Sequence, residues 1–312
     1  MKASTTVVWL SSLIGLLALI AAGVGLFWQD GGGSFSFTTL RGQSVEMYGR
    51  GLYRNDTLFV GAGNRGTDAV SLLLGIPLLV FSTLLYRRGS LRGGLVLTGA
   101  LTWFLCIGAS YALGAVAYNN LFLVYVALFS ASLFAAVLAL TSIDLQVLPS
   151  YFSSRIPRRG PAVFMFASGL LTLFVWLIEP ITALIQGRPP EHLGPYSTLF
   201  TNAVDMSIIV PAACVAGGLI LGRNALGYLI AVPLLVLEAM LAPLIVAQTL
   251  SQVQAGVSFT PGEMVGPMAG FAVLGLLAIC IIVAILRNIS ELSTSQAAHS
   301  QDKNTSDPDI LD

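Results

Sequence analysis

Residues 226–249 read LGYLIAVPLLVLEAMLAPLIVAQT, and Glu238 is the only charged side chain among these 24 residues. A helix needs about 20 apolar residues to cross a hydrocarbon core that is roughly 30 Å thick. The segment has this length, and its single acid lies near the centre, between Pro233 and Pro243. It therefore predicts a membrane-spanning helix with a carboxyl group deep inside it.

Seven further stretches have the same character, because each is apolar, of similar length and free of Lys and Arg. They are residues 6–28, 68–86, 93–114, 120–141, 161–184, 203–222 and 265–286. The chain of 312 residues is 55% hydrophobic and 10% charged, and its mean hydropathy is +0.84. This composition excludes a soluble protein, and a net charge of zero gives no reason to expect a nucleic acid partner. We therefore expect an all-α polytopic bundle of about eight transmembrane helices in the lipid bilayer.

The links between these segments differ in charge. One side of the membrane would hold ten basic residues: Lys2, Arg87, Arg88, Arg92, Arg155, Arg158, Arg159, Arg223, Arg287 and Lys303. The other side would hold Arg188 and a longer link with Arg41, Arg50, Arg54 and Arg65, and long links are translocated despite their charge. Because cytoplasmic links carry an excess of Lys and Arg, we expect a multi-pass protein of the plasma membrane with both termini in the cytoplasm.

The first segment has a second interpretation as a cleaved secretory signal. Lys2 precedes an apolar run that ends near the small residues Ala21, Ala22 and Gly23, which is typical of a signal peptide. The run is longer than the apolar core of about 7 to 15 residues usual in such signals. We therefore expect residues 1–28 to form an uncleaved signal-anchor helix.

The link of residues 29–67 is expected to form a small extracytoplasmic cap. Polar and apolar residues alternate at 34–37 and 45–48, and an apolar run follows at 58–60, which indicates two or three short strands. The alternative is an irregular loop packed on the helix ends, since about forty residues build little core alone. Residues 68–287 would form a seven-helix bundle. Residues 288–312 are rich in Ser, Asp, Asn and Gln and predict a disordered cytoplasmic tail.

Parts of the chain recur at an offset of 134 residues. The matches are TDAV at 67–70 with TNAV at 201–204, Pro77 with Pro211, Gly93 with Gly227 and Leu95 with Leu229. Such a repeat would make two parallel four-helix halves related by an axis along the membrane normal, an arrangement that some transporters use. The alternative is chance similarity between apolar helices.

Several of these residues also carry a resemblance. DMSIIVP at 205–211 and GYLIA at 227–231, together with GLYRND at 51–56 and NRGTD at 64–68, resemble a loose group of prokaryotic polytopic membrane proteins without an assigned activity. The resemblance implies a membrane location. It transfers no catalytic or binding residue to this chain.

Four acids are candidates for binding a ligand or an ion: Glu238, Glu179, Asp205 and Asp68. An ionised carboxylate at bilayer depth is costly unless a partner, water or an ion compensates it, and no predicted span contains Lys or Arg. Glu238 therefore either serves a site or makes a protonated, structural hydrogen bond. Glu179, Asp205 and Asp68 lie near the outer ends of their spans, where they would line an acidic vestibule. For Asp205 and Asp68 the alternative is stabilisation of a helix N-terminus, and Arg65 is a local partner for Asp68.

The sequence also excludes several kinds of chemistry. Lys2 and Lys303 are the only lysines, so no intramembrane lysine can hold a retinal. His192 and His299 are the only histidines, which excludes a multi-histidine zinc site, and the chain has no P-loop motif. We expect no cofactor, no resident metal and no catalytic residue.

Three classes of function remain. The preferred one is a small-solute or ion-coupled permease in which Glu238 titrates or binds a cation and Glu179 and Asp205 line the entry. The alternative is an extracytoplasmic sensor or membrane assembly partner whose cap meets a ligand or a protein partner. A membrane-embedded enzyme that acts on a lipid-linked substrate through paired carboxylates is disfavoured, because the chain lacks Arg clamps and suitable His residues.

Overall fold

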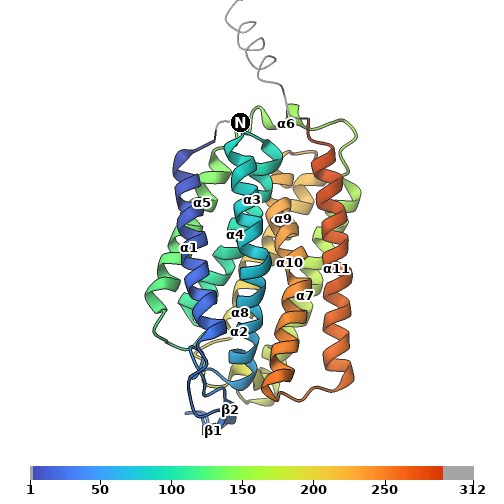
Figure 1. The fold of residues 1–312 in the computed structure, drawn as a ribbon. Helices are drawn as coiled ribbons and strands as arrows, with labels where there is room; N and C mark the ends of the chain where they lie inside the picture. The colour runs from blue at the N-terminus through green and yellow to red at the C-terminus, as the bar shows by residue number, and fades with distance from the viewer. Residues whose placement is uncertain (1–2, 291–312) are drawn as a thin grey trace, which may run out of the picture.

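The computed structural model describes residues 3–290, in which eight long helical segments run side by side (Figure 1). The first five segments are α1 (Thr5–Phe27); α2 (Leu58–Val70) continued by the π-helix η1 (Ser71–Gly75) and by α3 (Ile76–Arg87); α4 (Leu91–Leu113); α5 (Phe122–Thr141); and α7 (Arg159–Gln186). The last three are α8 (Phe200–Val204) continued by the π-helix η3 (Asp205–Ile209) and by α9 (Val210–Leu221); α10 (Leu226–Ala255); and α11 (Pro261–Arg287). Two short helices, α6 (Leu148–Tyr151) and the 3₁₀-helix η2 (Glu191–Leu193), lie in links.

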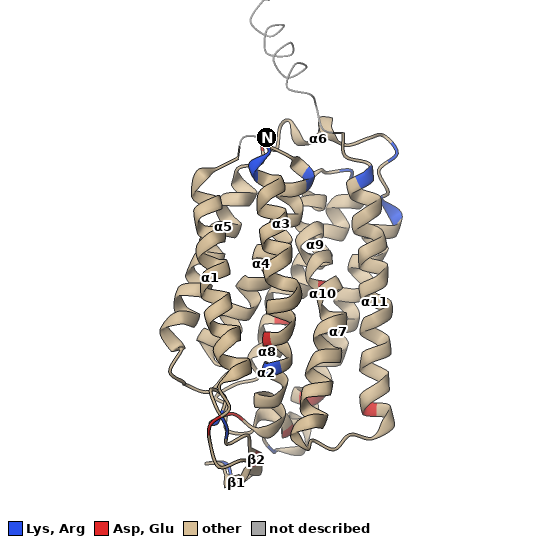
Figure 2. Ribbon diagram, viewed as in Figure 1, with Lys and Arg blue, Asp and Glu red and all other residues tan. Residues whose placement is uncertain are grey.

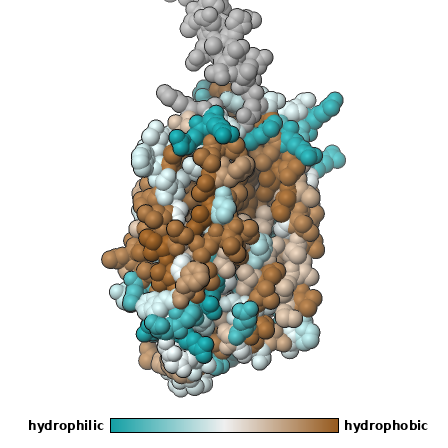
Figure 3. Space-filling model, viewed as in Figure 1, coloured by the Kyte–Doolittle hydropathy of each residue, from teal (hydrophilic) through white to brown (hydrophobic). Residues whose placement is uncertain are grey.

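All eight segments are long and apolar enough to cross a membrane, and the chain is an integral membrane protein. Figure 3 shows an apolar belt around the middle of the visible face, with hydrophilic residues above and below it. Large apolar side chains point outward from the bundle; Leu184 and Ile185, for example, are both 80% exposed. Lipid tails solvate such side chains without the cost they would have in water. The predicted all-α transmembrane bundle is confirmed.

The second segment begins ten residues earlier than predicted, at Leu58 instead of residue 68. The prediction that the cap extends to residue 67 is therefore wrong. The helix starts here because the Thr57 side chain caps it, accepting the backbone N–H of Val60 at 3.3 Å. Residues 61–68 (GAGNRGTD) are too polar and too rich in glycine for their hydropathy to reveal a span.

Packing against α10 stabilises this polar start of α2. The Gln248 side-chain amide donates to the Thr67 hydroxyl at 2.9 Å, and the Gln252 amide donates to the carbonyl of Phe59 at 3.0 Å. A Cβ atom at Gly66 would lie only 2.5 Å from the Cα of Gln248. The two helices thus approach so closely that residue 66 must be glycine. Helix α10 also packs against α4, α9 and α11, which makes it the central helix of the bundle.

The link between α1 and α2 carries a two-stranded antiparallel hairpin. Strand β1 (Phe35–Thr38) pairs with β2 (Ser44–Met47) in the register Phe35 to Met47 and Thr38 to Ser44. These strands match the first two alternating stretches of the sequence, but the third expected strand, at 58–60, is wrong because α2 occupies it. Beneath the hairpin, Tyr48, Leu52 and Tyr53 are buried. We call the end of the bundle with this hairpin the cap end.

The opposite end, which we call the basic end, carries the N-terminus, α6 and most of the basic residues (Figure 2). There the chain after α11 pairs with the link that follows α6: Ile289 forms an antiparallel bridge with Phe152, and its carbonyl accepts from Arg92 at 2.5 Å. Residues 288–290 therefore belong to the folded bundle and not to a disordered tail. The rest of the expected tail, residues 291–312, lies outside the described residues.

Two helical hairpins, α2 to α4 and α8 to α10, share backbone features at the offset found in the sequence. Their π-helices begin at Ser71 and Asp205, and 205 − 71 = 134. In each hairpin the turn after the first helix contains a left-handed residue, Gly89 with φ 78° and Arg223 with φ 61°, and 223 − 89 = 134. Arg223 is the only described residue other than glycine with positive φ.

The helices of the two hairpins also approach each other in the same way. A Cβ atom at Gly93 would lie 2.8 Å from the backbone nitrogen of Tyr86, and one at Gly227 would lie 2.7 Å from the backbone nitrogen of Ile220. The offset is again 134 for both members of the contact, since 227 − 93 and 220 − 86 are equal. The recurrence at an offset of 134 residues is therefore found both in the amino-acid sequence and in the backbone geometry of the two hairpins.

Candidate functional site

Glu238 lies in the middle of α10, between Pro233 and Pro243, as the sequence predicts. It is twelve residues from Leu226, which places it roughly 18 Å from the basic end of the helix. Its side chain is half-buried, and within residues 3–290 its carboxyl group makes no hydrogen bond or ion pair. The second interpretation of Glu238 is a structural hydrogen bond to a neighbouring helix. No residue in the described part of the chain is a partner for such a bond.

Asp205 is the acid that lies close to Glu238. It opens the π-helix η3, and Trp176 of α7 donates its indole N–H to the Asp205 carboxylate at 2.9 Å. The carboxyl groups of Asp205 and Glu238 are near enough to interact electrostatically, and the Cys106 thiol of α4 is also near Asp205. Two carboxyl groups from two helices therefore share one region inside the bundle. Acids inside membrane-spanning helices with no basic partner in contact within residues 3–290 are candidates for binding a proton or a cation.

Glu179 lies toward the cap end of the same group. It is three residues after Trp176 on α7, which is the spacing of neighbours on one helix face. Its carboxylate accepts the backbone N–H of His192 at 2.7 Å and lies 3.2 Å from the His192 ring nitrogen Nδ1. The His192 side chain is 72% exposed. Glu179 thus lies between the exposed cap end and the depth of Asp205.

The acids of the second half therefore lie at successive depths. Counted from the basic ends of their helices, Glu238 is about 18 Å deep, Asp205 about 24 Å and Glu179 about 30 Å. We call these three residues the acidic line. The sequence predicts that Glu179 and Asp205 share one depth; in the structure they are about one helical turn apart.

Asp68 is separate from the acidic line and does not contribute to an acidic vestibule. It is 2% exposed and accepts the hydroxyl of Tyr53 at 2.7 Å and that of Tyr111 at 3.4 Å. Arg65 is near enough to act electrostatically on Asp68, as expected, but the two form no ion pair in contact. The Arg65 side chain donates to the Tyr48 hydroxyl and to the carbonyl of Leu26. The arrangement is that of a buried, hydrogen-bonded carboxyl group in the core of the first half.

The alternative that Asp68 and Asp205 stabilise helix N-termini is also wrong. Asp68 is the eleventh residue of α2, which begins at Leu58. Asp205 is the sixth residue of the helical segment that begins at Phe200. The favourable interaction with the helix dipole is confined to the first turn, so neither carboxyl group gains it.

Asp56 is a buried acid at the cap end that sequence reasoning missed. It is 1% exposed, and its Oδ1 accepts the backbone N–H of Ala117 at 2.8 Å and the hydroxyl of Tyr196 at 2.9 Å. These contacts join the cap to the links that follow α4 and α7. Burial raises the pKa of Asp56 to about 7, although both hydrogen bonds lower it. Its only signal in the sequence is the short polar run NDT at 55–57.

The raised pKa of Asp56 predicts a pH dependence of stability. Between the ordinary pKa of 3.8 and the folded pKa of about 7, the unfolded chain has lost this proton while the folded chain retains it. The free energy of unfolding therefore falls as pH rises from about 4 to about 7, by about 4 kcal/mol for this group. We expect Asp56→Asn, which mimics the protonated acid, to remove that part of the slope in thermal unfolding at pH 5 and pH 8. An unchanged slope would contradict the assignment.

Comparisons of the chain with protein-family models, with curated proteins and with solved structures found no match. Within residues 3–290, no group of three or more His, Cys, Asp or Glu side chains is arranged to hold a metal ion. The function of the site therefore has to be argued from its geometry.

Proposed function

We propose that the protein is an ion-coupled permease for a small solute, with Asp205 and Glu238 as the carboxyl pair that takes up and releases the coupling proton or cation. The observation that carries this proposal is the electrostatic proximity of these two acids inside the bundle, with no Lys or Arg of residues 3–290 in ion-pair contact with either. Intramembrane acids of this kind are expensive, and they mark proton relays and ion pathways.

The recurring hairpins support the same function. We interpret α1 to α5 and α7 to α11 as two parallel four-helix halves, with η1 and η3 as equivalent breaks in helix geometry. π-helical turns frequently occur at functional sites, and η3 is the one that carries Asp205. In transporters built from repeats, the substrate and ion sites lie near the bilayer midplane between the repeats. Glu238 is at this depth on α10, the helix that packs against both α2 and α4.

The acidic line gives the pair a route to the aqueous phase. Glu179 and the exposed His192 form its entrance at the cap end. In this proposal the cap faces outward, the basic end and both termini face the cytoplasm, and the protein lies in the plasma membrane. Protons or cations would then enter from outside through Glu179 and reach Glu238 through Asp205.

A sensor or assembly role remains the second candidate, and one observation favours it. The cap contacts the opposite half of the bundle: Arg41 donates to the carbonyl of Tyr196 at 3.1 Å, and Gln43 donates to the carbonyl of Pro190 at 3.2 Å. A partner or ligand on the cap would therefore act on both halves. This role requires effects from cap substitutions and none from Glu238→Gln.

Water access to position 238 tests the permease. In a chain whose Cys106, Cys214 and Cys280 are replaced by Ala, we expect Glu238→Cys to react with a membrane-impermeant thiosulfonate reagent. The reaction should be at least about tenfold faster than for Val273→Cys, an outward-facing position on α11 that is 58% exposed. Asp205→Cys serves as a second variant if Glu238→Cys folds poorly. Rates as slow as that of Val273→Cys at both positions would contradict a water-filled route.

A further inference from the structure

The basic end of the bundle carries an excess of exposed positive charge (Figure 2). Seven arginine side chains are exposed there: Arg87, Arg88, Arg92, Arg155, Arg159, Arg223 and Arg287. Asp144 is the only exposed acid at this end within residues 3–290, and none of these arginines forms an ion pair in that part of the chain. One acid cannot balance seven arginines, so the described part of the chain leaves this surface strongly positive.

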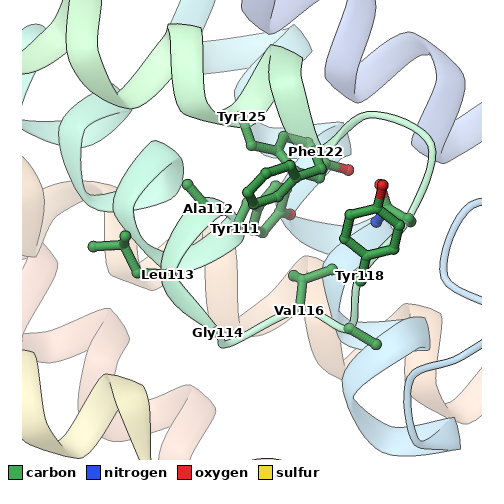
Figure 4. A pocket seen from close by; sticks show the side chains of 10 residues that line it. Tyr111, Ala112, Leu113, Gly114, Val116, Tyr118, Phe122 and Tyr125 are labelled. Carbon is green, nitrogen blue, oxygen red and sulfur yellow. The ribbon is translucent and has the colours of Figure 1, made fainter.

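The cap end is balanced in charge. Its exposed arginines and exposed acids are equal in number: Arg41, Arg50, Arg54 and Arg188 against Asp30, Glu46, Glu191 and Glu263. A pocket of about 240 Å³ at this end, in the turn between α4 and α5, is lined only by uncharged residues (Figure 4). Within residues 3–290, an anion is therefore attracted to the basic end and not to the cap end.

On α7, an arginine of the basic end stands at the head of an apolar, lipid-facing side of the helix. Arg159 lies four residues before Val163 and eleven before Leu170, which are 64% and 55% exposed. Residues four and eleven apart, about one and three helical turns, lie on one face of a helix. The acyl chains of a lipid that lies along this face would therefore place its headgroup at Arg159.

The same arrangement recurs on two other helices. On α11, Arg287 lies four residues after Val283 and eleven after Leu276, which are 40% and 64% exposed. At the end of α3, Arg88 lies four residues after Leu84, which is 49% exposed. Three separate helices thus present an exposed arginine directly beyond an outward-facing apolar side.

The lipid-facing sides of α1 and α5 end differently within the described residues. Helix α1 exposes Trp9 near its basic end, but Ala3 and Ser4, which precede the helix, carry no charge. Helix α5 is followed by the exposed acid Asp144. The described arginines therefore belong to particular helix faces and do not form a uniform ring around the bundle.

We propose that the arginine-headed faces of α3, α7 and α11 bind anionic phospholipids of the leaflet at the basic end. The guanidinium groups hold the phosphate-bearing headgroups, and the apolar side chains beside them contact the acyl chains. The continuity of charge and apolar surface on one helix face favours a lipid, because a soluble anion gains nothing from the apolar side chains. One arginine near a membrane surface favours an anionic lipid roughly fivefold. The proposal does not depend on the permease function.

Native mass spectrometry of the full-length protein in detergent tests this surface, with phosphatidylglycerol and phosphatidylcholine of identical acyl chains in competition. We expect phosphatidylglycerol to bind at least about fivefold more tightly. The double variant Arg159→Gln, Arg287→Gln should reduce this preference at least about fivefold, because it removes two of the charges. Both side chains are exposed and neither forms an ion pair within residues 3–290, so the variant should fold. Arg88→Gln replaces it if it does not.

Arg50→Gln is the matched control, because Arg50 is exposed in the cap and not on a membrane-spanning helix. It should leave the preference unchanged. Glycerophosphoglycerol, the headgroup without acyl chains, separates a lipid from a soluble anion, and its failure to displace phosphatidylglycerol supports the proposal. The proposal is overturned if this headgroup competes as well as the lipid, if the two lipids bind equally, or if the control lowers the preference as much as the double variant.

Discussion

Glu238→Gln is expected to abolish solute-driven proton movement while leaving the fold intact. In vesicles that contain the purified protein, proton flux should fall at least about tenfold relative to the wild type, because a glutamine cannot exchange a proton. The thermal unfolding midpoint should change by less than about 5 °C, since Glu238 makes no hydrogen bond or ion pair within residues 3–290 whose loss would destabilise the bundle. Flux is followed with a pH-sensitive dye enclosed in the vesicles.

Glu263→Gln is the matched control for this change. Glu263 lies on the surface at the start of α11, where it forms a capping box with Thr260. Glutamine can take the same place in a capping box, so the substitution removes one carboxyl group without disturbing the helix. We expect wild-type flux in this variant. Retained flux in Glu238→Gln would mean that Glu238 is not the coupling group.

Gly66→Ala is expected to destabilise the protein strongly by forcing apart two closely packed helices. The new Cβ would lie 2.5 Å from two backbone atoms of α10, the carbonyl carbon of Ala247 and the Cα of Gln248. Backbone atoms cannot move aside as a flexible side chain can, so α2 and α10 must separate. We expect the free energy of unfolding to fall by about 2 kcal/mol or more. Thermal unfolding followed by helical circular dichroism measures the change.

Gly218→Ala makes the same chemical change on α9, where a Cβ would contact nothing within 4 Å. An added methyl group in an open helical position raises stability by roughly 0.5–1 kcal/mol, because alanine is the better helix former. The two variants should therefore shift unfolding in opposite directions. Equal shifts would show that α2 and α10 are not in close contact at residue 66.

The positions of the spans could be predicted from the sequence because lipid-facing helices need long runs without charge. The start of α2 could not, since its stability comes from contacts with α10 through Gly66, Gln248 and Gln252. The contacting residues of α2 and α10 are more than 180 positions apart in the chain. The same long-range contact explains why the expected third strand at 58–60 is helical.

Within the candidate site, the sequence identified Glu238, Glu179 and Asp205 because a charge in an apolar span is conspicuous. It did not distinguish them from Asp68, whose tyrosine partners come from the cap and from α4. Asp56 was missed for a related reason. Acids in links are common on any surface, and only the folding of three links over one another buries Asp56.

The measurement that tests the central claim most directly is solute-driven proton flux by the wild-type protein in vesicles. Amino acids, sugars, organic acids, nucleosides and small amines would be added one at a time under an imposed pH gradient. The proposed function predicts that at least one solute class accelerates the loss of the gradient and that the reverse pH gradient drives accumulation of that solute. If no solute changes the flux while the protein remains folded, the ion-coupled permease is contradicted and the cap becomes the place to seek a function.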